Sequence, residues 1–465
     1  VPPPPPKSFI PAGAPLAHRR NGALVREWGF AASAQRGEPD RVGSTGRCKG
    51  PVGPGRSLAG AWISAQFRRH RRHALAAPPT ARHEWLQSAD CSHVAQAFPQ
   101  SAEPCQARSM LPNQLFETAG ASLIRTHELL RGGLRERDIA SMQRVGELFR
   151  VRRGYYVRQS TWDDALPELR HAIAIVAAHR ATHTGPVFSH RSASVVHGWP
   201  VWSAWLTHAP GNPRQVQTIS AVPGAGKLTA TRQRHLAALD DDDIVLASPA
   251  PGSNQLQHTS PERTLFDLAR AEPFSVALVA ADAHLHETAS TGRKVDALQV
   301  AGWRARMQAR SSAYAGRPGV RAVRMLARHA DPWAESPLET ISRLRFLQLG
   351  ISVETQVSVP APDGRKYFVD FYAPELGFWG ECDGKSKYVG AEVDGHATAE
   401  LLYAEKRRHD WIAGTTNLRG IRWGVREVLT RDRFARHLEA HGVAVPGLPS
   451  PLLEPETRWF LAKLP

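Results

Sequence analysis

Residues 366–388 read KYFVDFYAPELGFWGECDGKSKY, and this stretch decides the fold of the C-terminal part of the chain. It contains two apolar runs joined by a tight connection, and acidic residues interrupt both of them: Asp370 in the first, Glu381 and Asp383 in the second. Successive side chains of a strand point to opposite faces, so Glu381 and Asp383 share one face and Cys382 lies on the other. We expect two antiparallel strands that bring Asp370 beside Glu381 and Asp383.

The same alternation on the first strand places Asp370 on the face opposite to Val369 and Phe371. Three carboxylates that converge at one end of a sheet repel one another unless a cation neutralises them. A ligand set rich in oxygen and poor in nitrogen favours Mg²⁺ or Mn²⁺ over zinc. The sequence therefore predicts a divalent-metal site, and the alternative is an ordinary solvent-facing hairpin.

The flanking sequence adds a helix and a strand on each side of this pair. Ser336 is a candidate N-cap, with Pro337 at the first helical position and Glu339 at the third, which together form a capping box. A strand over 352–360 follows this helix. Beyond the acidic strand we expect a basic helix and then a strand over 420–425. That helix carries three cations that can meet phosphates: Lys406, Arg407 and Arg408.

This order of elements resembles the restriction-endonuclease-like PD-(D/E)XK superfamily, in particular its very-short-patch-repair-like domains of unknown function in bacteria. The motifs that carry the resemblance are SPLE at 336–339, VDF at 369–371, GECDG at 380–384, EKRRHDW at 405–411 and IRW at 421–423. The resemblance implies a metal-dependent phosphodiesterase, namely a DNA endonuclease. In such a domain Asp370 and Glu381 would hold the metal, and the Cys382 carbonyl would add a ligand. Glu339 would assist from the helix.

One position departs from the pattern of that superfamily. The lysine that follows the acidic ligand by two residues is here Asp383. Lys385 lies two positions further on the same face of the expected strand, so Lys385 or Lys406 would have to take its place. Without such a base or charge stabiliser, the domain would bind DNA and not cut it.

Residues 123–157, LIRTHELLRGGLRERDIASMQRVGELFRVRRGYYV, indicate short helices and then a hairpin. The pattern predicts helices over 113–119, 126–130 and 134–145. The stretch resembles the winged helix-turn-helix of abortive-infection type IV antitoxins (the AbiEi family), in which one helix enters the major groove and the wing meets the DNA backbone. Carried over, the recognition helix would present Arg135, Arg137, Gln143 and Arg144, and the wing would present Arg150, Arg152 and Arg153. The alternative is a winged helix that contacts proteins.

Residues 159–332 are expected to form a mixed α/β middle region that resembles the region behind such winged helices, with a scaffold or regulatory role. The stretch at 222–230 lacks the glycine and the hydroxyl residue of a phosphate-binding loop, so we expect no nucleotide there. The run Asp240–Asp243 is expected to be a solvated turn.

Residues 1–109 contain 15 Lys and Arg against 6 Asp and Glu, with no sustained period. We expect them to be disordered or an over-extended start, with the natural chain beginning near Met110. The alternative is a basic arm that binds nucleic acid.

The whole chain has a net charge of +16, which favours polyanionic partners. No apolar run is long enough to cross a membrane. The four cysteines, at 48, 91, 105 and 382, form neither a zinc nor a disulfide pattern and fit a reducing cytoplasm.

We therefore expect a multidomain α/β protein: a winged helix-turn-helix over 110–158, the middle region, a restriction-endonuclease-like domain over 333–447 and a tail over 448–465. Its expected function is DNA binding with a metal-dependent endonuclease domain, in a defence or toxin–antitoxin context. The expected partners are double-stranded DNA and a cognate toxin or regulatory protein, with neither membrane nor nucleotide. One alternative is an antitoxin-type transcriptional regulator with an inactive nuclease fold, and another is a protein-interaction module without nucleic acid.

Overall fold

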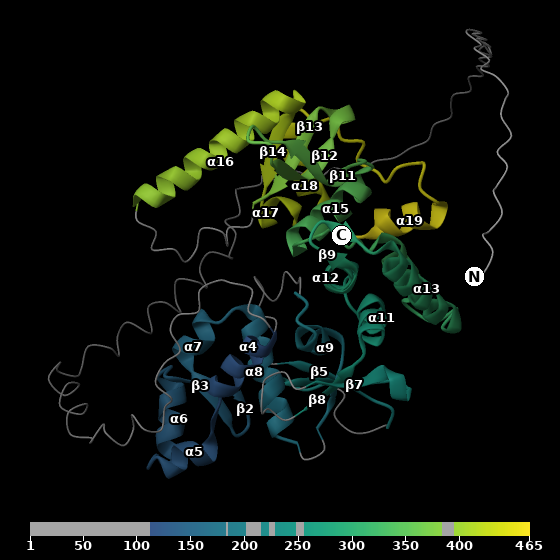
Figure 1. The fold of residues 1–465 in the computed structure, drawn as a ribbon. Helices are drawn as coiled ribbons and strands as arrows, with labels where there is room; N and C mark the ends of the chain where they lie inside the picture. The colour runs from purple at the N-terminus through teal and green to yellow at the C-terminus, as the bar shows by residue number, and fades with distance from the viewer. Residues whose placement is uncertain (1–111, 183–184, 201–214, 223–227, 248–254, 384–394) are drawn as a thin grey trace, which may run out of the picture. The chain divides into compact units, whose positions relative to one another are not determined.

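The structure is a computed structural model that describes residues 112–182, 185–200, 215–222, 228–247, 255–383 and 395–465 (Figure 1). The expectations for residues 1–109 and for Lys385 lie outside the described residues. The described part of the chain is mixed α/β, as the sequence predicts, with sheets of three, two, four and five strands. Within these residues, no helix combines the length and the apolar character needed to cross a membrane.

The N-terminal elements form a small antiparallel sheet with helices around it. In chain order they are α4 (Pro112–Ser122), β1 (Ile124–Arg125), α5 (Thr126–Arg131), α6 (Glu136–Arg144), β2 (Leu148–Arg152) and β3 (Tyr155–Arg158). The strand order is β1-β3-β2, so the short β1, which the sequence did not predict, completes the sheet. The hairpin turns at Gly154, whose φ of +85° favours glycine, and the Gly154 carbonyl accepts a 3.0 Å hydrogen bond from Thr126 N–H.

Local capping sets the start of α6. The backbone N–H of Arg135 donates to Asp138 Oδ2 at 2.9 Å, so the helix begins at Glu136 and not at residue 134 as predicted.

The middle region contains a five-stranded sheet with strand order β6-β5-β4-β8-β7. The strands are β4 (Val187–Phe188), β5 (Val216–Ser220), β6 (Arg232–Leu236), β7 (Ile244–Ala247) and β8 (Leu256–Thr259). The helices are α7 (Gln159–Asp164), α8 (Pro167–Arg180), α9 (His190–Val196), α11 (Pro261–Ala271), α12 (Phe274–Ala289), α13 (Ala297–Ala313) and α14 (Val320–His329). A small hairpin of β9 (Ser290–Thr291) and β10 (Lys294–Val295) joins α12 to α13.

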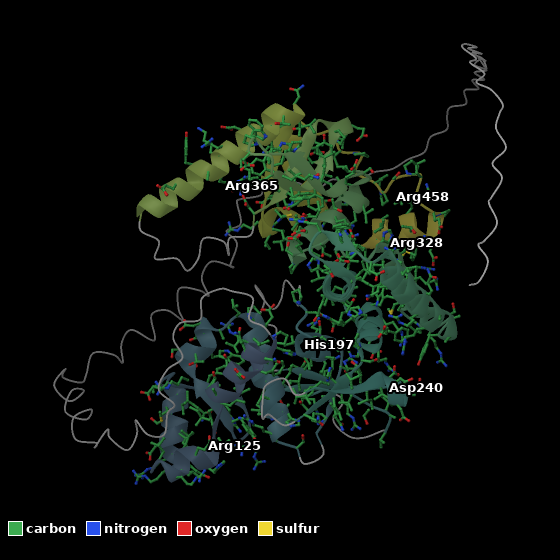
Figure 2. All side chains as sticks on the ribbon, in the orientation of Figure 1. Arg125, His197, Asp240, Arg328, Arg365 and Arg458 are labelled. Atoms are coloured by element: carbon green, nitrogen blue, oxygen red, sulfur yellow. The ribbon has the colours of Figure 1, made fainter. Side chains whose placement is uncertain are left out.

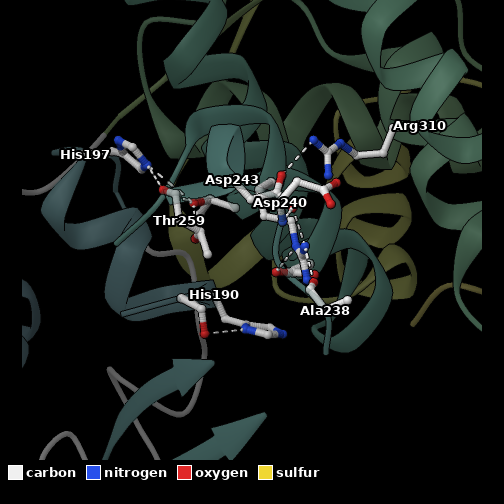
Figure 3. A network of polar contacts seen from close by, with 11 residues as sticks. His190, His197, Ala238, Asp240, Asp243, Thr259 and Arg310 are labelled. Atoms are coloured by element: carbon white, nitrogen blue, oxygen red, sulfur yellow. Dashed lines mark hydrogen bonds and ion pairs between the residues drawn. The ribbon is translucent and has the colours of Figure 1, made fainter. Parts of the chain in front are cut away.

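The expectation of a solvated turn at Asp240–Asp243 is wrong for Asp243, which is buried (Figure 3). Its carboxylate accepts hydrogen bonds from Arg263 at 2.6 Å and from Arg310 at 2.9 Å. Arg263 also bonds Asp267 at 2.9 Å, so the middle region holds an internal charge network that a run of acids in the sequence does not reveal.

The C-terminal part contains a four-stranded sheet with the order β11-β12-β13-β14. Its elements are α15 (Pro337–Leu349), β11 (Glu354–Pro360), β12 (Lys366–Ala373), the 3-10 turn η3 (Pro374–Leu376), β13 (Phe378–Cys382), α16 (Gly395–Thr416), β14 (Arg419–Trp423), α17 (Val425–Val428) and α18 (Arg431–Ala440). The first three strands pair antiparallel, and β14 runs parallel to β13 after the α16 crossover. The order of elements agrees with the sequence prediction. Ser336 caps α15 by accepting from Glu339 N–H at 3.2 Å.

Two cores hold this sheet. On the α15 side, Phe346 packs with Phe371, Phe378 and Trp423. On the α16 side, the buried residues Val359, Val369, Trp379 and Ile412 form a second core.

The last residues pack back onto the rest of the chain. The stretch 448–465, expected to be a tail, contains helix α19 (Pro455–Lys463), and its Leu461 is buried. Arg328 of α14, which is labelled in Figure 2, donates to Glu454 at 2.6 Å and to Thr457 at 2.7 Å at the start of α19.

A buried ion pair joins α12 to α15. Arg343 donates to Asp282 at 2.7 Å, and the Thr340 hydroxyl donates to the same carboxylate at 2.8 Å.

Candidate functional site

The first candidate surface lies on α6. Its inner face contributes Ile139 to a small core with Ile124, Leu129, Leu148 and Tyr156. The opposite face is exposed and follows helical spacing through Arg137, Ala140 and Arg144. The core therefore fixes which side of α6 faces solvent, and that side presents arginine.

Arg135, just before this helix, and Arg137, on it, are open to solvent. Their side chains are 67% and 70% exposed, and both approach Asp138, at 3.2 Å and 3.7 Å. Exposed ion pairs of this kind contribute little to stability, so both guanidinium groups remain accessible to an anionic partner. Gln143 differs, since its amide donates to the Ile139 carbonyl of its own helix at 3.5 Å.

The three arginines predicted for the wing lie on the β2–β3 hairpin and differ in exposure. Arg150 and Arg153 are exposed, whereas Arg152 is half-buried. Burial, with the nearby charge of Arg232 in β6, lowers the pKa of the Arg152 guanidinium. Arg152 thus faces the middle region more than solvent, and it is the weakest of the predicted wing contacts.

Sequence reasoning left out one further cation. Arg131, in the last turn of α5, is exposed beside the glycine link to α6. The sequence does indicate that Arg131 belongs to a basic surface, because residues 124–158 contain nine arginines and no lysine against four acids. Such an excess makes the whole segment basic, beyond the helix and hairpin residues named from the resemblance.

The second candidate site lies where β12 and β13 separate. The strands pair from Ala373↔Phe378 to Phe371↔Gly380, and no further, although both continue. At the point of separation the Cys382 N–H donates to Asp370 Oδ2 at 2.8 Å. We call this point the fork, defined by Asp370, Glu381 and Cys382.

Glu381 in the fork is buried and held by two arginines. Arg422 of β14 donates to its Oε2 at 2.8 Å, and Arg408 of α16 donates to its Oε1. Arg408 also donates to the Phe368 carbonyl of β12 at 2.6 Å, so it spans the two separating strands. Arg422 further contacts Glu405 and lies 3.7 Å from Asp383.

Glu339, predicted to assist from the helix, lies near Asp370. Burial, together with the charge of Asp370, raises the pKa of the Glu339 carboxyl to about 7. Ser336 donates to Glu339 Oε1 at 2.7 Å, and Gln356 of β11 donates to Oε2 at 3.1 Å. Glu339, Thr355 and Asp370 line one small hollow.

The expected alternation along β12 is wrong at Asp370. Val369 belongs to the core on the α16 side and Phe371 to the core on the α15 side, although alternation puts them on one face. Opposite this point, Gln356 of β11 has a φ of +55°, which L side chains rarely adopt. On both strands the side chains on either side of this point therefore pack into different cores, and Asp370 lies at the point where the packing switches.

The three cations predicted on α16 also differ in exposure. Lys406 and Arg407 are exposed and remain open to phosphates. Arg408 instead is committed to Glu381 and Phe368, which makes it an internal residue of the fork.

In this arrangement the residues that the resemblance assigns to Mg²⁺ or Mn²⁺ already have other partners. Both oxygens of Glu381 hold arginine, and Asp370 accepts from a backbone N–H. Among the described residues there is no group of three or more His, Cys, Asp or Glu side chains that could hold a metal.

Neither the comparison with protein-family models nor the comparison with curated proteins finds a match to this chain.

Proposed function

We propose that this protein binds double-stranded DNA through a winged helix-turn-helix made of α5, α6 and the β2–β3 hairpin. We further propose that its C-terminal domain, nuclease-like in the order of its elements, does not cut the DNA. This is the function of an antitoxin-type transcriptional regulator, with a cognate toxin or regulatory protein as a second partner.

The exposed arginine face of α6 carries the first half of the proposal. Arg137 and Arg144 lie opposite the small core, on the side that a major groove would receive. Arg153 lies in the hairpin turn, where a wing would meet the phosphate backbone. Arginine suits both tasks because its planar guanidinium bonds guanine edges and phosphates with two parallel N–H groups.

The occupied carboxylate of Glu381 supports the second half. A metal-dependent nuclease needs carboxylate oxygens free to bind the ion. Here Arg408 and Arg422 neutralise Glu381, and the expected lysine is replaced by Asp383.

Fluorescence anisotropy with a labelled duplex tests the DNA half. We expect the double variant Arg137→Ala/Arg144→Ala to weaken binding by about ten-fold or more. The reason is that each contact with a base contributes roughly 1–3 kcal/mol to the binding free energy. The double variant Arg317→Ala/Arg436→Ala, which removes two exposed arginines from the loop between α13 and α14 and from α18, is the charge-matched control and should change affinity less than about two-fold. Equal losses in both variants would reduce the interaction to general charge attraction and contradict the proposed surface.

One observation favours the endonuclease as a second candidate function. Glu339 and Asp370 are close enough for the charge of one to raise the pKa of the other, and a cation would relieve this repulsion. A plasmid-nicking assay with Mg²⁺ or Mn²⁺ separates the candidates. The regulator leaves plasmid intact, whereas the endonuclease cuts it and loses that activity in Asp370→Ala and Glu381→Ala. Equal cutting by all three proteins would point to a contaminating nuclease.

A further inference from the structure

A cavity of about 440 Å³ lies where N-terminal, middle and C-terminal elements meet. This volume falls within the roughly 300–1,000 Å³ of small-molecule sites in proteins. Its walls come from α4, α8, the end of α9, α12 and the start of α15. The apolar lining includes Leu115, Leu169, Val195, Trp199, Val279 and Ala283.

The side chain of Trp199, in one wall of this cavity, is fixed by aromatic neighbours. Trp199 is buried, its ring stacks on His197 with centroids 4.4 Å apart, and it meets the edge of His284 at 5.2 Å. His197 in turn bonds the Thr259 carbonyl at 3.0 Å (Figure 3). The indole is therefore fixed before any ligand arrives, which lowers the entropic cost of binding.

The charged groups of the lining are all acidic. Asp164 and Glu168 come from the α7–α8 side and Glu335 from the segment before α15. Glu335 also pairs with Arg293 at 3.2 Å, which leaves Asp164, an exposed side chain, as the acid most open to a ligand. No lysine or arginine is among the described residues that line the cavity.

We propose that this cavity binds a small apolar organic cation, an aromatic or aliphatic amine. The hydrocarbon part would lie against Trp199 and the aliphatic walls, and the ammonium would face Asp164 and Glu335. The one basic residue among the described lining residues is His286, whose Nδ1 contacts the Pro332 carbonyl at 2.9 Å. An anionic ligand would therefore meet acids without a lysine or arginine partner and is disfavoured. The proposal for this cavity does not depend on the proposed DNA binding. The lining residues come from α4, from α8 and from α15, the helix that carries Glu339.

The competing occupant is the chain itself. Two lining residues, Pro112 and Pro200, border stretches outside the described residues. If such a stretch filled the cavity, no added small molecule could enter, and the experiment below would show no binding.

Three probes of similar size and different charge test the proposal on the full chain: phenethylamine, 2-phenylethanol and phenylacetate. Binding is measured at pH 7 by saturation-transfer NMR and titration calorimetry. We expect the amine to bind about ten-fold more tightly than phenylacetate, a difference of about 1.4 kcal/mol, with the alcohol between them. Absence of binding by all three probes, or tightest binding by phenylacetate, overturns the proposal.

Two variants place the binding in the cavity. Ala283→Leu adds volume to the lining and should abolish binding of the amine, whereas Ala305→Leu, at an exposed position of α13, should leave it unchanged. Asp164→Asn, a surface change that keeps the fold, should reduce the amine to the affinity of the alcohol. Unchanged amine binding in both Ala283→Leu and Asp164→Asn overturns the proposal, even if the probes bind elsewhere on the chain.

Discussion

The helix pair with its hairpin and the four-stranded sheet are both rich in arginine, but their arginines have different partners. On α6, Arg137 and Arg144 face solvent, because the buried side of the helix is filled by Ile139 and its neighbours. At the sheet, Arg422 of β14 and Arg408 of the adjoining helix α16 are held by the carboxylate of Glu381. The difference teaches that residue type alone does not assign arginine to nucleic acid. What lies opposite the guanidinium in the fold decides its role.

The strongest test of this comparison removes an arginine whose side chain is only 12% exposed. Arg343→Ala would leave the buried carboxylate of Asp282 without its cation, and breaking such a pair costs about 3–5 kcal/mol. We expect urea unfolding to show a loss of this size. The exposed Arg137→Ala should change the free energy of unfolding by less than about 0.5 kcal/mol. Similar losses in the two variants would contradict the division between internal and surface arginines.

A smaller effect is expected at the fork. Arg408→Ala removes a donor from Glu381 and from the Phe368 carbonyl, which should destabilise the protein by roughly 1–3 kcal/mol. Its neighbour Arg407 is exposed on the same helix, so Arg407→Ala is a matched control with little expected effect. Thermal unfolding followed by circular dichroism compares them. A loss in Arg407→Ala equal to that in Arg408→Ala would count against the fork as an internal site.

An expected change in stability of similar size depends on pH. The pKa of Glu339 is raised from its ordinary 4.5 to about 7, so the folded protein keeps a proton that the unfolded chain has lost between these values. Its contribution to the free energy of unfolding therefore falls as the pH rises from about 4.5 to 7. Relative to wild type, Glu339→Gln should gain at most about 3 kcal/mol across this window, because each unit of pKa difference corresponds to about 1.4 kcal/mol.

The control for this effect is Glu354→Gln, at the exposed start of β11. Its difference from wild type should stay constant over the same pH range. A constant difference for Glu339→Gln as well would mean that the carboxyl does not titrate as its burial requires.

The features that sequence could predict are those fixed by near neighbours. Ser336 and Glu339 are three residues apart, so their capping contact and the start of α15 follow from local chemistry. The order of helices and strands from α15 to β14 follows from apolar periodicity and is also confirmed.

The features that sequence could not predict depend on distant residues. Asp370 departs from simple alternation beside Gln356, whose left-handed backbone no apolar pattern announces. The partners of Glu381 lie 27 and 41 residues away, on α16 and β14. Asp243 is likewise buried by Arg310, which lies 67 residues further along the chain. Carboxylate roles are therefore less predictable than strand positions, because tertiary pairing assigns them.

The most direct test of the divided arginine roles is the salt dependence of duplex binding, measured by anisotropy for wild type and two variants. Each phosphate contact that is lost reduces the slope of log affinity against log salt by about 0.9. We expect Arg150→Ala/Arg153→Ala, at the hairpin, to reduce the slope by about 1.8, which corresponds to the loss of two phosphate contacts. Arg408→Ala should leave the slope unchanged. A slope that stays constant in the hairpin variant and falls in Arg408→Ala would contradict the account.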